Sequence, residues 1–541
     1  MIANGSTRRD FLRWTGSVAA TALGTRFLQA AEPSRVSRPN ILFIMVDEMR
    51  WNAMGCAGNP IVRTPNLDRL AREGTRFATA YTCAPVCVPS RYCFFTSRYA
   101  HVHGSTDNST PPQPGQVLLP VLLKHYGYQT ALSGKLHFLP PDQEYGFDYF
   151  WSFSNEGPGK LQRWPEYMDA RHGRGSARRL VPGSQPFPND PLGHDLGKLP
   201  YPKEDSQTFW ITDRAIDFLR QRDRQRPFFL FVSYLDPHSP SHLCEPYWSM
   251  YDAKNMPRPR IPESVKKERA EAVRSDARGG GRHLISDEAM ARALTAAYYA
   301  KVTMVDDNVG RLLQQVESMG LSDDTIVVFT ADHGNMLGDH CRWFKGVMYE
   351  GSSRIPLLMK TARKGEFAAA FNRGKVVDEL VENIDVMPTL MEMIGRPLPS
   401  GSGFQGASLI NLVVGKKTAW KTALFAERGS MMIRTARHKL IKNQAKDLRK
   451  GGGEYELYDL VKDPGEDANL IDDPACASLA AELKARLEAW QRDCPSLPGI
   501  EGLSVVNTGR SVGDGPGQGK TTGASSKRRA RAGRRVQPND L

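Results

Sequence analysis

The sequence lacks several patterns that would identify whole classes of protein. None of its eight cysteines belongs to a C-x-x-C pair, which argues against a structural zinc site. After the first thirty residues no apolar run is long enough to cross a bilayer, so we expect no transmembrane span. No internal repeat is present, which excludes a repeat architecture. The 541 residues, 40% of them apolar, are ample for a large buried core.

The sequence also has fewer acidic than basic residues. The chain has 59 Asp and Glu against 72 Lys and Arg, a formal net charge of +13 at pH 7. Segment 499–541 is rich in Gly, Ser and Arg without apolar periodicity, and we predict a disordered basic tail there. We interpret the basic run 527–535 as a solvated end, with substrate tethering as the alternative. Positive charge attracts nucleic acid, acidic membranes and anionic substrates alike, so charge by itself does not identify a partner.

The first residues have the pattern of an export signal. The string Thr7-Arg8-Arg9-Asp10-Phe11-Leu12-Arg13 resembles the twin-arginine motif, and a mildly apolar stretch follows it up to Leu28. Small residues at 30 and 31 provide a place for the signal to end. We therefore predict a signal at 1–31 and an exported protein, periplasmic or extracellular. A disordered, basic N-terminus is the alternative.

Alternation of strands and helices predicts the fold class. A continuous apolar run at 41–46 indicates a buried strand, and the segments 128–133, 228–234 and 325–330 indicate further buried strands. Segments between them indicate helices, at 65–74, 212–220 and 293–319. This alternation predicts an α/β domain at 38–400, built on a large, mostly parallel mixed sheet with helices on both faces.

After residue 363 the pattern changes. We predict a helix at 384–394, four short strands at 423–427, 431–434, 439–442 and 455–459, and a last helix at 478–491. These elements predict a smaller C-terminal α+β subdomain at 401–497, an antiparallel sheet plus helix.

Polar residues follow the ends of the predicted strands, which is where open α/β sheets bind their ligands. They are Asp47-Glu48, Gly134-Lys135-Leu136-His137, His238 and Asp332-His333-Gly334, with Lys345 farther along and Cys87-Val88-Pro89-Ser90-Arg91 entering a helix. Each motif alone has an ordinary structural explanation, such as a cap, a turn or a core cysteine. Their joint occurrence at one edge of one sheet predicts an active site.

The string C-V-P-S-R at 87–91 resembles the C-x-P-S-R signature of type I sulfatases, members of the alkaline phosphatase superfamily. TPNLDRLAREG at 64–74, GYQTALSGKLHF at 127–138, TADHGNMLGDH at 330–340 and YELYDLVKDPGEDANL at 455–470 extend the resemblance. It implies hydrolysis of sulfate monoesters on an alkaline phosphatase-like fold. It also implies that a formylglycine-generating enzyme converts Cys87 into formylglycine (3-oxoalanine).

The resemblance further implies one Ca²⁺ per chain, held by Asp47, Glu48, Asp332, His333 and hydrated formylglycine 87. The family usually has Asp or Gln at the place of Glu48, and histidine is an unusual ligand for calcium. In the implied mechanism Asp332 activates the attacking hydroxyl and Arg91 fixes and polarises it. Lys135 and Lys345 hold sulfate oxygens, and His137 takes a proton in the second step. His238 or Lys345 protonates the leaving alcohol.

Two rival functions remain open at this stage. One is a phosphonate monoester or phosphodiester hydrolase of the same superfamily, and the other is a non-catalytic binder of sulfated polysaccharide. For the substrate, residues 134–150 resemble choline sulfatases, although Gly346 stands where that group has Met. The Gly-, Pro- and Arg-rich insertion at 156–203 could admit a sugar over the site. We expect a sulfated carbohydrate first and choline sulfate second, and no nucleic-acid partner.

Overall fold

The computed structural model describes residues 38–141, 143–152, 163–186, 196–263, 265, 287–398, 403–416, 419–444 and 453–493. The predicted export signal and basic tail lie outside the described residues, as do parts of the 156–203 insertion. Among the described residues, no helix is both long and apolar enough to cross a membrane.

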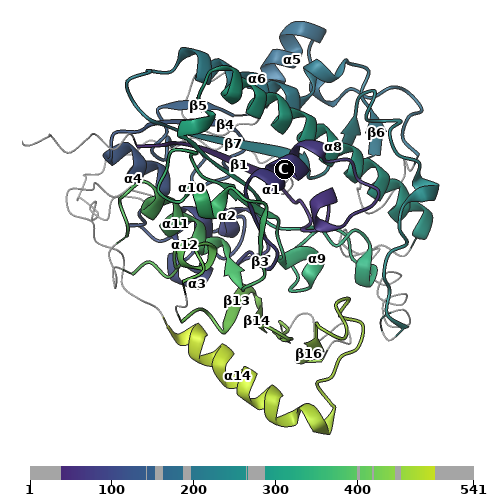
Figure 1. Ribbon diagram of the computed structural model, residues 1–541. Helices are drawn as coiled ribbons and strands as arrows, with labels where there is room; N and C mark the ends of the chain where they lie inside the picture. Colours follow the sequence, from purple (N-terminus) through teal and green to yellow (C-terminus); the bar gives the residue numbers. More distant parts are fainter. Residues whose placement is uncertain are drawn as a thin grey trace, which may run out of the picture. The chain divides into compact units, whose positions relative to one another are not determined.

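Eight strands of the described chain form one mixed sheet (Figure 1). In spatial order they are β11 (Lys375–Val377), β2 (Thr75–Phe77), β10 (Leu357–Lys360), β9 (Thr325–Ala331), β1 (Asn40–Asp47), β7 (Phe228–Pro237), β4 (Gln129–Gly134) and β5 (Tyr149–Trp151). Strands β9, β1, β7, β4 and β5 run parallel, and β10 is antiparallel to both of its neighbours. The prediction of a large, mostly parallel mixed sheet is confirmed.

Helices cover both faces of this sheet, as Figure 1 shows. One face packs against α1 (Pro65–Glu73), α6 (Gln207–Gln221) and α8 (Glu288–Ser318). The other face packs against α2 (Cys87–Thr96), α4 (Leu119–His125) and α11 (Val386–Met393). Because β1 is covered on both sides, its residues 41–46 are all apolar and fully buried or nearly so. Phe43 makes edge-to-face contacts with Phe94 and Phe95 of α2, at 6.1 and 6.0 Å between ring centroids, and so anchors α2 to the sheet.

A second, antiparallel sheet lies in the C-terminal part of the described chain. Its order is β13 (Ala423–Arg428), β14 (Ser430–Thr435), β15 (His438–Lys442) and β16 (Tyr455–Asp459). Helix α14 (Ala477–Arg492), yellow in Figure 1, packs on it through Leu483, Leu487 and Trp490. These elements confirm the predicted small antiparallel sheet plus helix.

Shorter elements connect these parts. They are β3 (Ala80–Tyr81), β6 (Leu196–Lys198), β8 (Ser241–Leu243), β12 (Val381–Glu382), α3 (Ala100–His103), α5 (Trp164–His172), α9 (Glu350–Ser353), α10 (Ala368–Phe371) and α12 (Ile410–Val413). Strand β6, from the 156–203 insertion, pairs in parallel with β8, which begins three residues after His238. The described end of the insertion is therefore tied to the segment that carries a predicted site residue.

A buried ion cluster joins the C-terminal sheet to the larger domain. Lys439 of β15 is fully buried, and its ammonium lies 2.7 Å from a carboxylate oxygen of Glu350 and 2.7 Å from one of Glu466. It also donates to the carbonyl of Met348, at 3.0 Å. Since α9 begins five residues after Lys345, this cluster also anchors the chain that follows the site.

We expect the Lys439→Met variant to be less stable than the wild type by about 3–5 kcal/mol, because it leaves two buried carboxylates without their cation. Denaturant unfolding would measure the difference. Lys462→Met, at an exposed position of the same region, is the matched control and should change the free energy of unfolding by less than about 0.5 kcal/mol. Equal stabilities of the two variants would contradict the role assigned to Lys439.

Candidate active site

The two predicted acidic positions meet at the carboxyl ends of neighbouring strands. Val46 of β1 is paired with Ala331 of β9, so Asp47 and Asp332 follow side by side. The backbone N–H of Glu48 donates to Asp332 Oδ1, at 3.0 Å. Register in the sheet thus brings together two residues that are 285 positions apart, as expected for the open edge of an α/β sheet.

Four metal-binding side chains converge at this edge: Asp47, Cys87, Asp332 and His333, with one ligand atom of each within 4.8 Å of the others. Cys87 is the first residue of α2, and its Sγ lies 3.2 Å from His333 Nε2 and 3.7 Å from Asp47 Oδ1. Nδ1 of His333 lies 3.0 Å from the carbonyl of Gly334, which can only accept, so Nδ1 carries the proton. In the neutral tautomer that this contact selects, Nε2 directs a lone pair into the cluster, as a metal ligand requires. The donor set fits a divalent cation.

Two cations hold the carboxylates in place. The Arg91 guanidinium is fully buried and donates to Asp332 Oδ2 at 3.0 Å, to Asp47 Oδ2 at 3.4 Å and to the carbonyl of Lys135 at 2.8 Å. The Lys135 ammonium lies 2.5 Å from Asp47 Oδ2. Burial raises the pKa of Asp47, but the charges of Lys135 and Arg91 outweigh it and hold that pKa well below the ordinary value. Asp47 is therefore ionised and able to bind a cation.

The turn that carries Cys87 is tethered on several sides. The N–H of Val88 donates to Asn108 Oδ1 at 3.1 Å, and Ser90 Oγ donates to the carbonyl of Asp332 at 2.5 Å. Asn383 Nδ2 donates in turn to Ser90 Oγ at 3.3 Å. Burial, followed by the charge of Asp47, raises the pKa of the Cys87 thiol to about 12. The thiol itself is thus protonated and is not an activated nucleophile.

A second group lies beside the first and consists of Glu48, His238 and Lys345. Lys345 Nζ donates to Glu48 Oε2 at 2.8 Å and lies 2.6 Å from His238 Nε2. Burial and the charge of Lys345 lower the pKa of His238 well below its ordinary value. The charge of Glu48 outweighs the effect of burial and raises the pKa of Lys345. Lys345 therefore carries the proton of this pair, and His238 is neutral.

His137 follows β4 after a sharp turn. Gly134 has φ +112°, and a Cβ there would lie 1.9 Å from the carbonyl oxygen of Ser233, so only glycine fits. Burial, then the charges of Lys135 and Arg91, lower the pKa of His137 well below its ordinary value. Within the described part of the chain its buried Nδ1 has no hydrogen-bond partner. A neutral imidazole with an unpartnered nitrogen beside Lys135 is suited to accept a proton.

All ten residues singled out in the sequence are thus described, and the structure brings nine of them into two groups in direct contact. The exception is His137. Its link to the groups is electrostatic, because the charges of Lys135 and Arg91 help to lower its pKa. Among the contacting residues that the sequence analysis missed are Asn108, Ser233, Asn335 and Asn383. Their partners lie 20 to 293 positions away, so no local pattern marks them.

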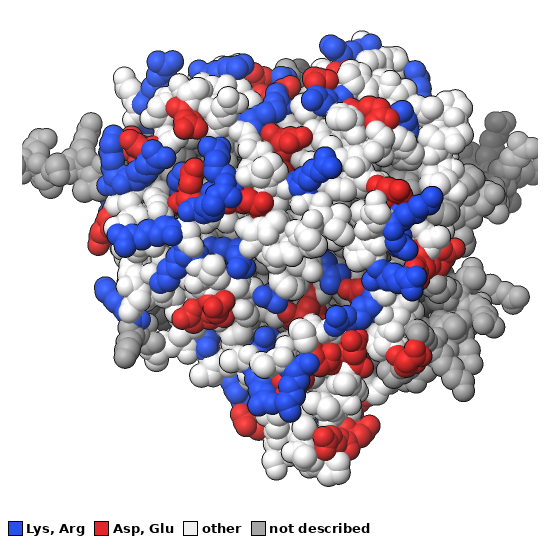
Figure 2. Space-filling model, turned by 45° about the vertical axis from the view of Figure 1, so that its right-hand side comes forward, with Lys and Arg blue, Asp and Glu red and all other residues white. Residues whose placement is uncertain are grey.

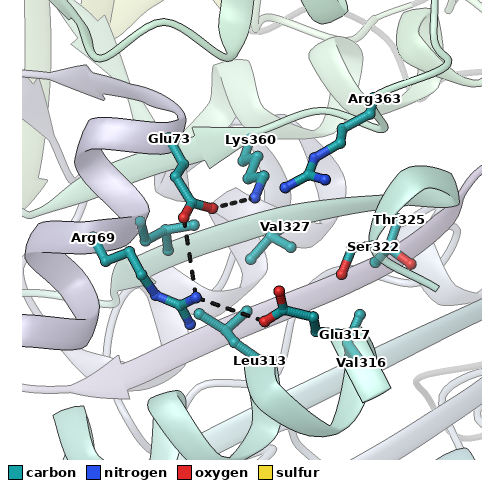
Figure 3. A pocket seen from close by; sticks show the side chains of 11 residues that line it. Arg69, Glu73, Leu313, Val316, Glu317, Ser322, Thr325, Val327, Lys360 and Arg363 are labelled. Atoms are coloured by element: carbon teal, nitrogen blue, oxygen red, sulfur yellow. Dashed lines mark hydrogen bonds and ion pairs between the residues drawn. The ribbon is translucent and has the colours of Figure 1, made fainter. Parts of the chain in front are cut away.

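Two hollows in the described surface differ in their relation to the site. One, of about 30 Å³, lies at the opposite end of β9 and is lined by Arg69, Glu73, Glu317, Lys360 and Arg363 (Figure 3). Its charges are paired with each other, for example Lys360 with Glu73 at 2.5 Å. The other, of about 320 Å³, is lined by residues 50–52 and 336–337, which lie a few positions after Glu48 and His333 along the chain. None of the ten predicted site residues lines either hollow.

Comparison with known proteins adds independent evidence. The family model described as Sulfatase matches residues 39–396, and that described as N-sulphoglucosamine sulphohydrolase, C-terminal, matches 338–493. An arylsulfatase of Clostridium perfringens is 32% identical over 456 residues, which cover 80% of this chain and 90% of that protein. An N-acetylglucosamine-6-O-sulfatase of Bacteroides thetaiotaomicron is 30% identical over 532 residues, covering 85% and 88%.

Two solved structures share the architecture. A phosphonate monoester hydrolase of Agrobacterium radiobacter has a TM-score of 0.69 at 24% identity, and the match covers 85% of this chain and 97% of that chain. A protein solved with its substrate D-glucosamine-2-N,6-O-disulfate has a TM-score of 0.63 at 27% identity, covering 84% and 97%. The first likeness shows the fold alone.

Proposed function

Since the chain belongs to the sulfatase family of the alkaline phosphatase superfamily, and is therefore a sulfuric ester hydrolase, we propose that it hydrolyses sulfate monoesters of carbohydrates with a formylglycine made from Cys87 and one Ca²⁺. The observation that carries the proposal is the convergence of Cys87 with Asp47, Asp332 and His333, next to Lys135 and Arg91. A sulfate monoester is an anion, and these cationic groups oppose its charge.

The metal would be held by Asp47, Asp332, His333 and the oxygen of modified residue 87, with Glu48 next to them. Most of these donors are oxygens, which favours Ca²⁺. When present, the cation and the hydrated aldehyde supply the Lewis acid and the two hydroxyls with which the family attacks and releases sulfate. Conversion of Cys87 requires a formylglycine-generating enzyme as partner, and the twin-arginine pattern supports export of the folded product.

Residues of the chain itself orient the ligands, bind the sulfate group and transfer protons. Arg91 helps to keep Asp47 ionised and orients Asp47 and Asp332 toward residue 87. Lys135 and Lys345 hold sulfate oxygens, and the unpartnered Nδ1 of His137 accepts a proton when sulfate is released. Lys345, with His238 at 2.6 Å, supplies the proton that the leaving alcohol needs.

Support for a carbohydrate comes from the N-acetylglucosamine-6-O-sulfatase and from the structure with D-glucosamine-2-N,6-O-disulfate. On the face shown in Figure 2, Lys and Arg are interspersed with Asp and Glu, which favours an enzyme over a binder that relies on a basic surface. Sulfate release should be measured on sulfated sugars, choline sulfate and a phosphonate monoester. Faster turnover of either of the last two would contradict the proposal.

We expect Lys135→Ala to lower kcat by roughly 10²–10³-fold on every sulfate ester, as for the loss of a donor to a developing charge. The reason is that Lys135 contacts the sulfuryl group, which all substrates share. Kinetics on an aryl sulfate and on a sugar sulfate would measure the effect. Lys124→Ala, an exposed lysine near β4, is the control and should leave kcat unchanged. A loss confined to one substrate would show that Lys135 recognises the alcohol instead.

A further inference from the structure

Glu48 directly follows a metal-binding aspartate, yet its environment differs from that of Asp47. Its backbone has a φ of +68°, its N–H donates to Asp332 Oδ1 at 3.0 Å, and its carbonyl accepts from Tyr298 Oη at 2.7 Å. These bonds fix a conformation that is uncommon for a residue with a side chain. The peptide therefore holds the carboxylate of Glu48 in one place, and that place determines what it can do.

Both carboxylate oxygens of Glu48 are already engaged by donors of the chain. Oε1 accepts from Asn335 Nδ2 at 2.6 Å, and Oε2 accepts from Lys345 Nζ at 2.8 Å. His238 Nε2 also lies 3.2 Å from Oε2. Glu48 is not one of the four possible ligands that converge at Cys87; it lies with Asp47 and His238 in a second group whose ligand atoms are also close enough to hold a cation. The contacts of its two oxygens with Asn335 and Lys345 distinguish it from the first group.

Lys345 and His238 are arranged around this carboxylate. Nδ1 of His238 lies 2.6 Å from the carbonyl of Ser239 and so carries the ring proton. Its Nε2 is then an acceptor, and the Lys345 ammonium donates both to it and to Glu48. On the far side, the buried Lys301 ammonium donates to the carbonyls of His238 and Pro240. The pair is thus held between Glu48 and Lys301.

Asn335 fixes the same arrangement from a third direction. Its Oδ1 accepts from the N–H of Leu337 at 2.8 Å and from that of Phe344 at 3.2 Å, while its Nδ2 holds Glu48. Since Phe344 precedes Lys345, one side chain orients both the carboxylate and the backbone of the lysine that binds it.

We propose that Glu48 is not a ligand of the cation in this protein but a positioning residue, which with Asn335 aligns Lys345 and His238 toward the leaving oxygen of the substrate. The inference rests on the proposed function, because it assumes that this pair protonates the leaving alcohol. The cation is then held by Asp47, Asp332, His333 and residue 87 alone. The additional methylene of Glu48, relative to the Asp usual in the family, places its carboxylate against Lys345.

The test separates metal binding from leaving-group chemistry. Ca²⁺ affinity of chelator-treated protein would be measured by calorimetry for the wild type, Glu48→Gln, Asn335→Ala and, as the ligand control, Asp47→Asn. Values of kcat would be measured on a nitrophenyl sulfate, whose leaving group needs no proton, and on an alkyl sulfate, whose leaving group does. Because a glutamine oxygen could still bind a cation, Glu48→Leu is added to remove both oxygens.

We expect Glu48→Gln, Glu48→Leu and Asn335→Ala to bind Ca²⁺ with affinities less than tenfold weaker than the wild type, and Asp47→Asn to lose roughly 10-fold or more. The Glu48 and Asn335 variants should lose roughly 10²-fold in kcat on the alkyl sulfate and little on the nitrophenyl sulfate.

A tenfold or greater loss of Ca²⁺ affinity in Glu48→Gln, or equal kcat losses on both esters, would overturn the inference. If Glu48→Leu does not fold, the Ca²⁺ affinity and the two kcat values of Asn335→Ala still test the inference. A wild type inactive on sulfate esters would refute the proposed function, whereas the calorimetry would still test the ligand assignment.

Discussion

The Cys87→Ala variant should release sulfate with a kcat lower by roughly 10⁵–10⁶-fold, the loss typical of removing the nucleophile from groups that act as a unit. Cys87 is the first residue of α2 and lies within 4.8 Å of the three proposed metal ligands. No other described residue occupies that point, so the remaining groups would orient a substrate that nothing attacks. Kinetics on an activated aryl sulfate would measure the residual rate.

Mass spectrometry of the peptide that contains Cys87 provides the direct test of its modification. Active protein should contain the aldehyde, and protein made without a formylglycine-generating enzyme should retain the thiol and lack turnover. Cys244→Ala, which removes another buried thiol, is the matched control and should keep both the modification and the activity. Full activity of a preparation in which every Cys87 is still a thiol would refute the formylglycine mechanism.

Strands β1, β7 and β9 could be predicted because burial on both faces makes their sequences mostly apolar. Strand β1 differs from its prediction by one residue at each end. The short strands β2, β10, β11 and β5 were not predicted. Each has three or four residues, and pairings such as Leu358 with Arg76 join segments far apart in the sequence. Their conformation depends on tertiary partners rather than on a local pattern.

The residues of the site also differ in whether a local sequence pattern or a tertiary contact determines their position. Asp47, Lys135 and Asp332 could be located because they follow recognisable strands, and the topology of the sheet then brings strand ends together. The helix expected at 293–319 begins earlier, at Glu288, because the Asp287 side chain accepts from the N–H of Met290 and caps it. The different environments of Asp47 and Glu48 could not be inferred, because a sequence pattern does not distinguish between two adjacent acidic residues. The direction of the Glu48 side chain depends on Asn335 and Lys345, almost 300 positions away. That of Asp47 depends on Arg91 and Lys135.

The double variant Asp47→Asn, Asp332→Asn should lose more than roughly 10³-fold in kcat, because it removes both carboxylates of the proposed metal site. The two acids also neutralise Arg91 and Lys135, whose buried charges would otherwise have no carboxylate beside them. Chelation of the wild type should abolish turnover in the same way. Added Ca²⁺ should restore activity better than Zn²⁺, because oxygens outnumber nitrogen in the donor set.

The control for this experiment removes the same number of charges elsewhere. Asp213→Asn, Asp217→Asn changes two acids of α6 that pair with surface arginines, and it should leave kcat and Ca²⁺ affinity unchanged. Calorimetry distinguishes loss of the metal from loss of the fold, because a folded variant without its ligands keeps a cooperative unfolding transition while it no longer binds Ca²⁺. Undiminished activity of the Asp47→Asn, Asp332→Asn protein would show that the reaction does not use a metal at this edge of the sheet. A chelator-resistant wild type would lead to the same conclusion, since turnover would then continue without a bound cation.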